Sequence, residues 1–173
     1  NGSSTADSTP TITGSTEAGA AVRVVITDST GGTVFDGLAT VAPDGSWTVD
    51  STALTDGTYT AAATATDGVG NAATDAVSFS VDTTDPVVAI STPTAGSVNA
   101  TPTMAGTVDE ADAAVHVVVT DSTGATVFAG DATVAPGGTW TIDSTTLADG
   151  AYTVTATATD PAGNTGTDAV AFT

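Results

Sequence analysis

The chain has 173 residues, with 20 Asp plus Glu against a single Arg and no Lys, for a formal net charge of −19. The absence of Cys excludes disulfides, thiol chemistry and Cys-ligated zinc. With no Lys and a single Arg, the chain is not expected to bind nucleic acid, and binding to anionic membrane surfaces is disfavoured. With one His and no serine in a nucleophile-elbow sequence, we expect no enzymatic activity.

Most of the chain consists of two similar sequence repeats. The segment 28–79 returns as 121–172 at an offset of 93, with 36 of the 52 paired positions identical, and residues 10–14 return as 102–106 at an offset of 92. A period near 90 residues suits a small domain used in tandem. We therefore predict repeat 1 over residues 1–81, an acidic linker over 82–86, and repeat 2 over 87–173. Repeat 1 has no counterpart of residues 87–90 at its start, so we interpret its N-terminal strand as truncated and the sequence as a window from a longer array.

Strand signals recur every 8–12 residues between turns rich in Gly, Pro and Asp. In repeat 2 the predicted strands span residues 87–90, 103–107, 115–120, 126–134, 139–143, 152–158 and 168–172. In the strand over 152–158, Tyr152, Val154, Ala156 and Ala158 alternate with threonines, which is typical of a half-buried antiparallel strand. The sequence thus predicts an all-β chain of two tandem immunoglobulin-like β-sandwich domains, about seven strands each, end to end.

The aromatic residues fit that fold. Tyr59 and Tyr152 each follow an Asp-Gly turn, as in the tyrosine corner of immunoglobulin domains. Trp47 and Trp140 share the apolar register of their strands, which favours a core position over a sugar-stacking platform. His116, on a threonine-lined strand face, is expected at the surface. Asn1 and Asn99 match the N-glycosylation pattern.

Three motifs together resemble a known family. They are the segment 66–71 with its copy 159–164 (Thr-Asp-x-x-Gly-Asn), the Asp-Ala-Val-x-Phe strands, and the segment 81–86 (Val-Asp-Thr-Thr-Asp-Pro). They are similar to the bacterial Ig-like tandem repeats of giant secreted, surface-attached adhesins. The resemblance implies a non-catalytic extender module at the cell surface or in biofilm, whose partners are neighbouring repeats of the same chain, often with Ca²⁺ stiffening the joints. No membrane insertion is expected in this segment, and the adhesive ligand is not identified.

Sandwich topology brings the incoming linker, the loop after the second strand and the loop after the sixth strand to one end of a domain. In repeat 2 this end gathers carboxylate and amide oxygens, the ligands that Ca²⁺ prefers. The predicted metal ligands are Asp82, Asp85, Asp109, Glu110, Asp112, Asp160 and Asn164, with further candidates in repeat 1 at Asp28, Asp56, Asp67 and Asn71. Asp in turns also caps backbone N–H groups without any metal, and an acidic surface also suits saline conditions. Both interpretations stay open here.

Two other functions are compatible with the sequence. A subunit of an extracellular filament, self-associating by strand addition, would use the open sheet edge left by the missing strand of repeat 1. A carbohydrate-binding module would instead present Trp47 or Trp140 to solvent.

Overall fold

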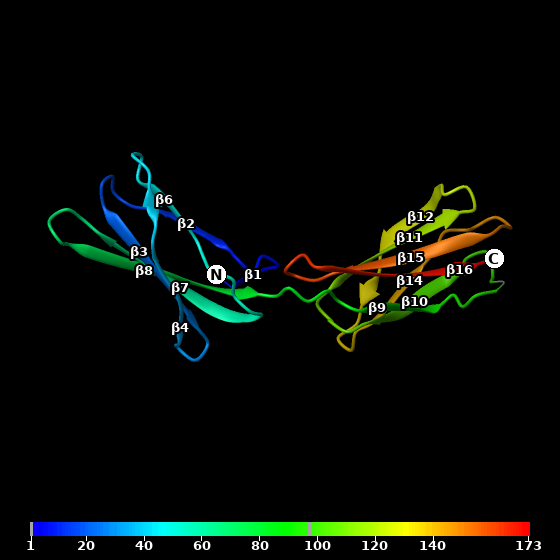
Figure 1. The fold of residues 1–173 in the computed structure, drawn as a ribbon. Helices are drawn as coiled ribbons and strands as arrows, with labels where there is room; N and C mark the ends of the chain where they lie inside the picture. The colour runs from blue at the N-terminus through cyan, green and yellow to red at the C-terminus, as the bar shows by residue number, and fades with distance from the viewer. Residues whose placement is uncertain (1, 97) are drawn as a thin grey trace. The chain divides into compact units, whose positions relative to one another are not determined.

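The structure is a computed structural model that describes residues 2–96 and 98–173. These residues form strands joined by turns and loops, in two compact units that span Asn1–Thr84 and Asp85–Thr173 (Figure 1). Within the described residues, no helix has the length and apolar character that crossing a membrane requires.

Unit 1 is a two-sheet sandwich. A five-stranded sheet has the order β1-β8-β7-β3-β4, and a three-stranded sheet has the order β2-β6-β5. The strands are β1 (Ser3–Thr5), β2 (Thr11–Ser15), β3 (Ala21–Asp28), β4 (Thr33–Leu38), β5 (Thr40–Val41), β6 (Ser46–Asp50), β7 (Gly57–Thr66) and β8 (Ala72–Val81).

Unit 2 repeats this arrangement with two four-stranded sheets, ordered β13-β14-β10-β9 and β12-β11-β15-β16. The strands are β9 (Val88–Thr92), β10 (Thr103–Val108), β11 (Ala114–Asp121), β12 (Thr126–Asp131), β13 (Thr133–Val134), β14 (Thr139–Asp143), β15 (Tyr152–Thr159) and β16 (Thr165–Phe172). These orders correspond to the two sheets of an immunoglobulin sandwich. The predicted all-β, immunoglobulin-like fold is therefore confirmed.

The core forms where alternate residues of the two sheets of a unit face each other. In unit 2, Val117 of β11 and Ala156 of β15 are fully buried, and so is Met104 from the facing sheet. The intervening threonines on β15 are half-buried or exposed. Strand alternation of period two thus places one face of each sheet in the core, as the sequence predicted.

One predicted strand is wrong in its bounds. The segment 126–134 forms two strands, since β12 pairs with β11 and β13 pairs with β14 of the other sheet. The crossing occurs at Ala132, whose N–H donates to the Val115 carbonyl at 2.8 Å. Ala39 makes the same crossing in unit 1, through the Val22 carbonyl at 2.9 Å. Apolar alternation continues through the crossing, so period two gave no sign of it.

The N-terminal segments of the two units differ. Unit 1 begins with β1, which pairs in parallel with the end of β8. Unit 2 has a similar contact, in which Val98 and Thr173 donate to the carbonyls of Thr173 and Gly96, and in addition has β9 paired with β10. Among the described residues of unit 1, no strand corresponds to β9.

Both tyrosine corners are present. The Tyr59 hydroxyl donates to the Thr55 carbonyl at 2.6 Å, and the Tyr152 hydroxyl donates to the Ala148 carbonyl at 2.8 Å. Each ring stacks on a phenylalanine of the neighbouring strand, at centroid distances of 5.7 Å for Phe79 and 5.6 Å for Phe172. This corner closes the last turn before β7 and β15.

Candidate functional site

Asp160 is a buried carboxylate on the turn between β15 and β16, with only 5% of its surface exposed. Its Oδ1 accepts the N–H groups of Gly163 at 2.6 Å and Asn164 at 2.8 Å. Its Oδ2 accepts the Asn164 side-chain amide at 2.7 Å. A carboxylate offers about four lone-pair positions, so these bonds leave room for another ligand on Oδ2.

The pKa of Asp160 reflects two opposing effects. Burial raises it, because a charged group loses solvation. Hydrogen bonds from the Asn164 side chain and from the backbone of the turn outweigh burial, and the net pKa is lowered. Asp160 is therefore a carboxylate anion near neutral pH.

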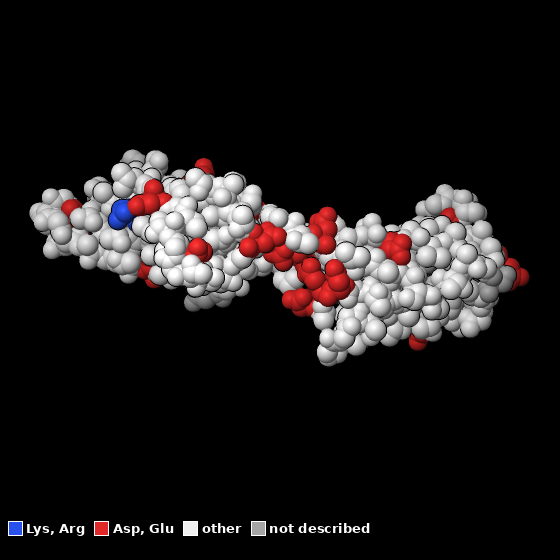
Figure 2. Space-filling model, turned by 60° about the horizontal axis from the view of Figure 1, so that its bottom comes forward, with Lys and Arg blue, Asp and Glu red and all other residues white. Residues whose placement is uncertain are grey.

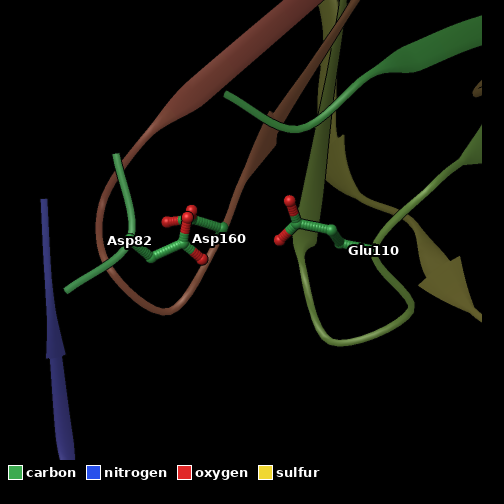
Figure 3. Close-up of side chains that lie close together, drawn as sticks. All are labelled: Asp82, Glu110 and Asp160. Carbon is green, nitrogen blue, oxygen red and sulfur yellow. The ribbon is translucent and has the colours of Figure 1, made fainter. Parts of the chain in front are cut away.

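Glu110 is a second carboxylate of unit 2 that lies close to Asp160. It lies half-buried on the loop between β10 and β11, and one of its carboxylate oxygens lies within 4.8 Å of one from Asp160. Figure 3 shows both side chains on their loops and also Asp82, the residue that follows β8. The structure thus brings together two of the predicted ligands from loops 50 residues apart in the sequence.

The other predicted ligands of unit 2 have different surroundings. Asp109 accepts the Val87 N–H on Oδ1 at 2.7 Å and so fixes the start of β9. Asp85 and Asp112 are exposed. Asn164 donates to Asp160, as described above.

In unit 1 the candidate residues make turn-capping contacts. Asp28 accepts N–H groups of Thr30 and Gly32, each at 2.9 Å. Asp67 is bound by Asn71 through both backbone and side chain, at 2.8 and 2.7 Å, in the same way as Asp160 by Asn164. The residue that corresponds to Glu110 is Glu17, because the carbonyl of each accepts the N–H of the residue three positions later, Ala20 or Ala113. Glu17 lines one pocket together with Asp67, so this end of unit 1 also has a second carboxylate.

Asp56 has a separate role. It accepts the N–H and hydroxyl of Thr83, both at 2.9 Å, and the hydroxyl of Thr84 at 3.0 Å. These contacts hold the segment that follows β8 against the turn before β7. The Thr83 hydroxyl is the largest influence that lowers the pKa of Asp56, followed by the Thr83 N–H and the Thr84 hydroxyl.

Sequence reasoning missed two carboxylates that bind backbone. Asp109 was expected only as a metal ligand, and Asp168 was not singled out, although its Oδ2 accepts the Ile90 N–H at 2.7 Å. Asp109 binds a residue 22 positions away in the sequence, and Asp168 binds one 78 positions away. No local turn motif therefore predicts either contact.

The remaining polar candidates lie at the surface. His116 is exposed, as predicted, and its Nδ1 lies 2.6 Å from Asp131. Its counterpart Arg23 pairs with Asp36. Arg23 is the single Arg of the sequence and is drawn blue in Figure 2, where Asp and Glu are red. Asn99 lies on an exposed loop, and Asn1 lies outside the described residues.

The tryptophans are core residues, as predicted. Trp140 is 1% exposed and Trp47 is 9% exposed, and both belong to the core clusters of their units. Buried indoles present no ring face for a sugar to stack on.

Comparison with protein-family models is decisive for the family. A model described as "Bacterial Ig-like domain" matches residues 1–83 and 96–173. The chain belongs to the bacterial Ig-like domain family. A second model, for bacterial Ig-like domains of group 3, matches residues 45–133. No match was found among curated proteins.

Solved structures give further likenesses for this bacterial Ig-like chain. A tetra-tandem repeat from the extending region of a large adhesion protein is 34% identical over 96% of the chain, with a TM-score of 0.44. The fibronectin(III)-like modules of Clostridium thermocellum CbhA are 16% identical, with a TM-score of 0.61, and cover 99% of this chain and 88% of that one. The latter likeness shows the shared fold. The chain spans 45% of the length of the adhesion-protein structure.

Proposed function

We propose that this chain is a non-catalytic extender module of a secreted, surface-attached bacterial protein such as an adhesin, in which Ca²⁺ restrains the segment that joins the two Ig-like units. The observation that carries the extender role is the strand-for-strand repetition of the units. Even a register shift recurs, between Ile26 and Thr27 in β3 and between Val119 and Thr120 in β11. Modules that recognise different ligands differ in their loops, whereas here turn-capping Asp28 and Asp121 make the same contacts.

The calcium part of the proposal rests on Glu110 and Asp160. Their oxygens are within 4.8 Å, and Ca²⁺ binds oxygen at about 2.3–2.6 Å, so one ion is able to contact both. Without a cation, two like charges at such a distance repel by about 1 kcal/mol even in water. Turn bonds hold Asp160 in place, so little side-chain entropy is lost on binding an ion.

Further ligands would come from the segment that leads into unit 2. Asp85 is the first residue of unit 2, and Asp82 lies only three positions before Asp85. Three peptide units span at most about 11 Å between Cα atoms, which keeps Asp82 close to Asp85 in any conformation. An ion that bound Asp82 or Asp85 together with Asp160 would couple this segment to unit 2. Backbone carbonyls and water would complete the six to eight ligands that Ca²⁺ takes.

The test is thermal unfolding of the chain in EDTA, CaCl₂ and MgCl₂ at matched ionic strength. Calcium at about 100 times its Kd stabilises a binding state by about 2.7 kcal/mol, which corresponds to a rise of several degrees in Tm. We expect this rise with Ca²⁺ and not with Mg²⁺, because Mg²⁺ demands a tighter octahedral shell. An equal rise with both salts would show that the acidic surface responds only to ionic strength.

Asp160→Asn and Asp67→Asn form a matched pair for the same experiment. Both remove a carboxylate that caps an identical turn, and both units have a glutamate at the corresponding position, Glu17 or Glu110. Only Asp160, however, belongs to the unit that the acidic segment with Asp82 and Asp85 leads into. We expect Asp160→Asn to abolish the Ca²⁺-dependent part of the Tm shift and Asp67→Asn to leave it intact. Small-angle scattering in both states then measures whether bound Ca²⁺ restricts the motion of the joining segment. The same shift in both variants would contradict the assignment.

A further inference from the structure

The backbone that joins the two units is short (Figure 1). β8 ends at Val81 and β9 begins at Val88, so residues 82–87 make up the joining segment. Unit 1 ends at Thr84 and unit 2 begins at Asp85, so the joining segment has one part in each unit. The contacts of each part with its own unit determine how far the segment is able to move.

The part in unit 1 is held by a strand and by a carboxylate. The Asp82 N–H donates to the Thr5 carbonyl of β1 at 3.0 Å. Asp56 Oδ1 accepts the N–H and the hydroxyl of Thr83, both at 2.9 Å, and its Oδ2 accepts the Thr84 hydroxyl at 3.0 Å. Hydrogen bonds to an ionised carboxylate are roughly twice as strong as those between neutral groups. This part of the joining segment is therefore fixed to unit 1.

The part in unit 2 is held by a different carboxylate. Asp109 Oδ1 accepts the Val87 N–H at 2.7 Å, and the Asp109 N–H donates to the Val87 carbonyl at 3.2 Å. Pro86 is fully buried, and its carbonyl oxygen lies so close to Gly166 that a Cβ on that glycine would come within 1.8 Å of it. Pro86 and Val87 are therefore fixed to unit 2.

Asp85 is the residue between these two fixed parts. It is exposed, and within the described part of the chain it makes no hydrogen bond. Because peptide planes are rigid, the backbone torsions that remain free to change are ψ of Thr84 and φ and ψ of Asp85. The proline that follows disfavours a helical conformation at Asp85 and fixes its own φ. The movable part of the joining segment is thus confined to one residue.

We propose that Asp56 and Asp109 are two carboxylate clasps, each of which holds the nearer part of the joining segment by hydrogen bonds alone. As a result, the two units turn relative to each other only about the backbone torsions next to Asp85. This role rests on the proposed extender function, which needs a stiff joint, but neither clasp needs a metal ion. A Ca²⁺ ion bound by Asp85 would act on the one residue that the clasps leave movable.

The test is amide NMR relaxation of the full chain in EDTA, so that Ca²⁺ makes no contribution. A rigid backbone amide has an order parameter of about 0.85, and a flexible one has a value below about 0.6. We expect rigid values at Thr83, Thr84 and Val87 in the wild type. Asp56→Ala should bring Thr83 and Thr84 into the flexible range and leave Val87 unchanged.

Asp149→Ala is the matched control. Asp149 lies in the equivalent Asp-Gly turn of unit 2, so its replacement changes the net charge equally. Among the described residues it makes no hydrogen bond to the joining segment, and its loss should leave all the order parameters unchanged. Thr83→Val keeps the side-chain shape and the backbone N–H but removes one bond to Asp56. It should therefore lower the order parameters less than Asp56→Ala does. Unchanged amide shifts in β3 would show that unit 1 stays folded in each variant.

Residual dipolar couplings of the same samples measure the turning of the units. Units that turn freely have alignment tensors of different magnitude, whereas units joined by a restricted segment have tensors of similar magnitude. We expect similar magnitudes in the wild type, and a larger difference after Asp56→Ala or Asp109→Ala than after Asp149→Ala.

Flexible order parameters at Thr83 and Thr84 in the wild type would overturn the proposal, and so would rigid values that Asp56→Ala leaves unchanged. The calcium proposal fails separately. If CaCl₂ equalises the two tensors but Asp56→Ala has no effect in EDTA, the clasps are wrong and the calcium assignment stands. If Asp56→Ala loosens the segment in EDTA but CaCl₂ changes nothing, the clasps are supported and the calcium assignment is contradicted.

Discussion

The carbonyl oxygen of Pro86 lies over Gly166, where a Cβ would come within 1.8 Å of it. Gly166→Ala should therefore displace the start of β9 and destabilise unit 2 by about 1–3 kcal/mol, a typical cost of overpacking. Urea unfolding measures this loss. Gly137→Ala is the control, because a Cβ at Gly137 meets no atom within 4 Å. Equal losses for the two substitutions would contradict this prediction, because they would show that the start of β9 can be displaced without lowering the free energy of unfolding.

The tyrosine corners give a second prediction. Tyr59→Phe removes the hydroxyl that donates to Thr55 in partly buried surroundings, and Tyr152→Phe removes an exposed counterpart bound to Ala148. Each should lose about 0.5–1.5 kcal/mol of unfolding free energy, with the larger loss at Tyr59, since hydrogen bonds are stronger away from water. The stacked rings remain in both variants, so neither measured loss includes a contribution from ring packing. A larger loss for Tyr152→Phe in urea unfolding would contradict this order.

The hydrogen bonds of Asp56 lead to a prediction about how the free energy of unfolding depends on pH. Its folded-state pKa is lowered, chiefly by the hydroxyl of Thr83, so it contributes stability above the unfolded pKa of about 3.9 and loses it as pH falls through the folded pKa. Asp56→Asn removes this contribution at every pH. The stability difference between wild type and variant should thus be constant from neutral pH to about pH 5 and should shrink at lower pH. Measuring the difference cancels the general relief of charge repulsion on acidification, and a difference that grows below pH 5 would refute the assignment.

The fold could be predicted from the sequence because apolar and polar residues alternate clearly in the strands that form the core. Val115, Val117 and Val119 alternate with exposed or half-buried residues in β11, and the structure buries all three. The crossing at Ala132 was not predictable, since both sheets present the same apolar alternation to one core. Contacts such as Asp168 with Ile90 depend on pairing between distant segments and have no local signal.

The candidate metal site was predictable only in part, for a chemical reason. A carboxylate that caps a turn and one that binds Ca²⁺ use the same oxygens in the same Gly- and Asn-rich loops. Asp67 and Asp160 have the same motif and the same capping bonds. Both units also have a glutamate at the corresponding position, Glu17 or Glu110, so the loops alone do not separate the two sites. What separates them is the acidic segment with Asp82 and Asp85 that leads into unit 2.

The two tryptophans provide a last prediction. Trp140 is 1% exposed and its indole N–H lies 3.3 Å from the Thr107 carbonyl. Trp47 is 9% exposed and lines an open groove of unit 1 together with Ile12 and Ala63. Acrylamide should thus quench Trp47 more readily, and Trp47→Phe should lower the quenching constant of the remaining fluorescence below that of the wild type. Soluble glycans should shift neither emission, because neither ring face is presented for stacking. A glycan-dependent shift that Trp47→Phe removes would favour carbohydrate binding at the groove, since Trp47 is the indole that borders it.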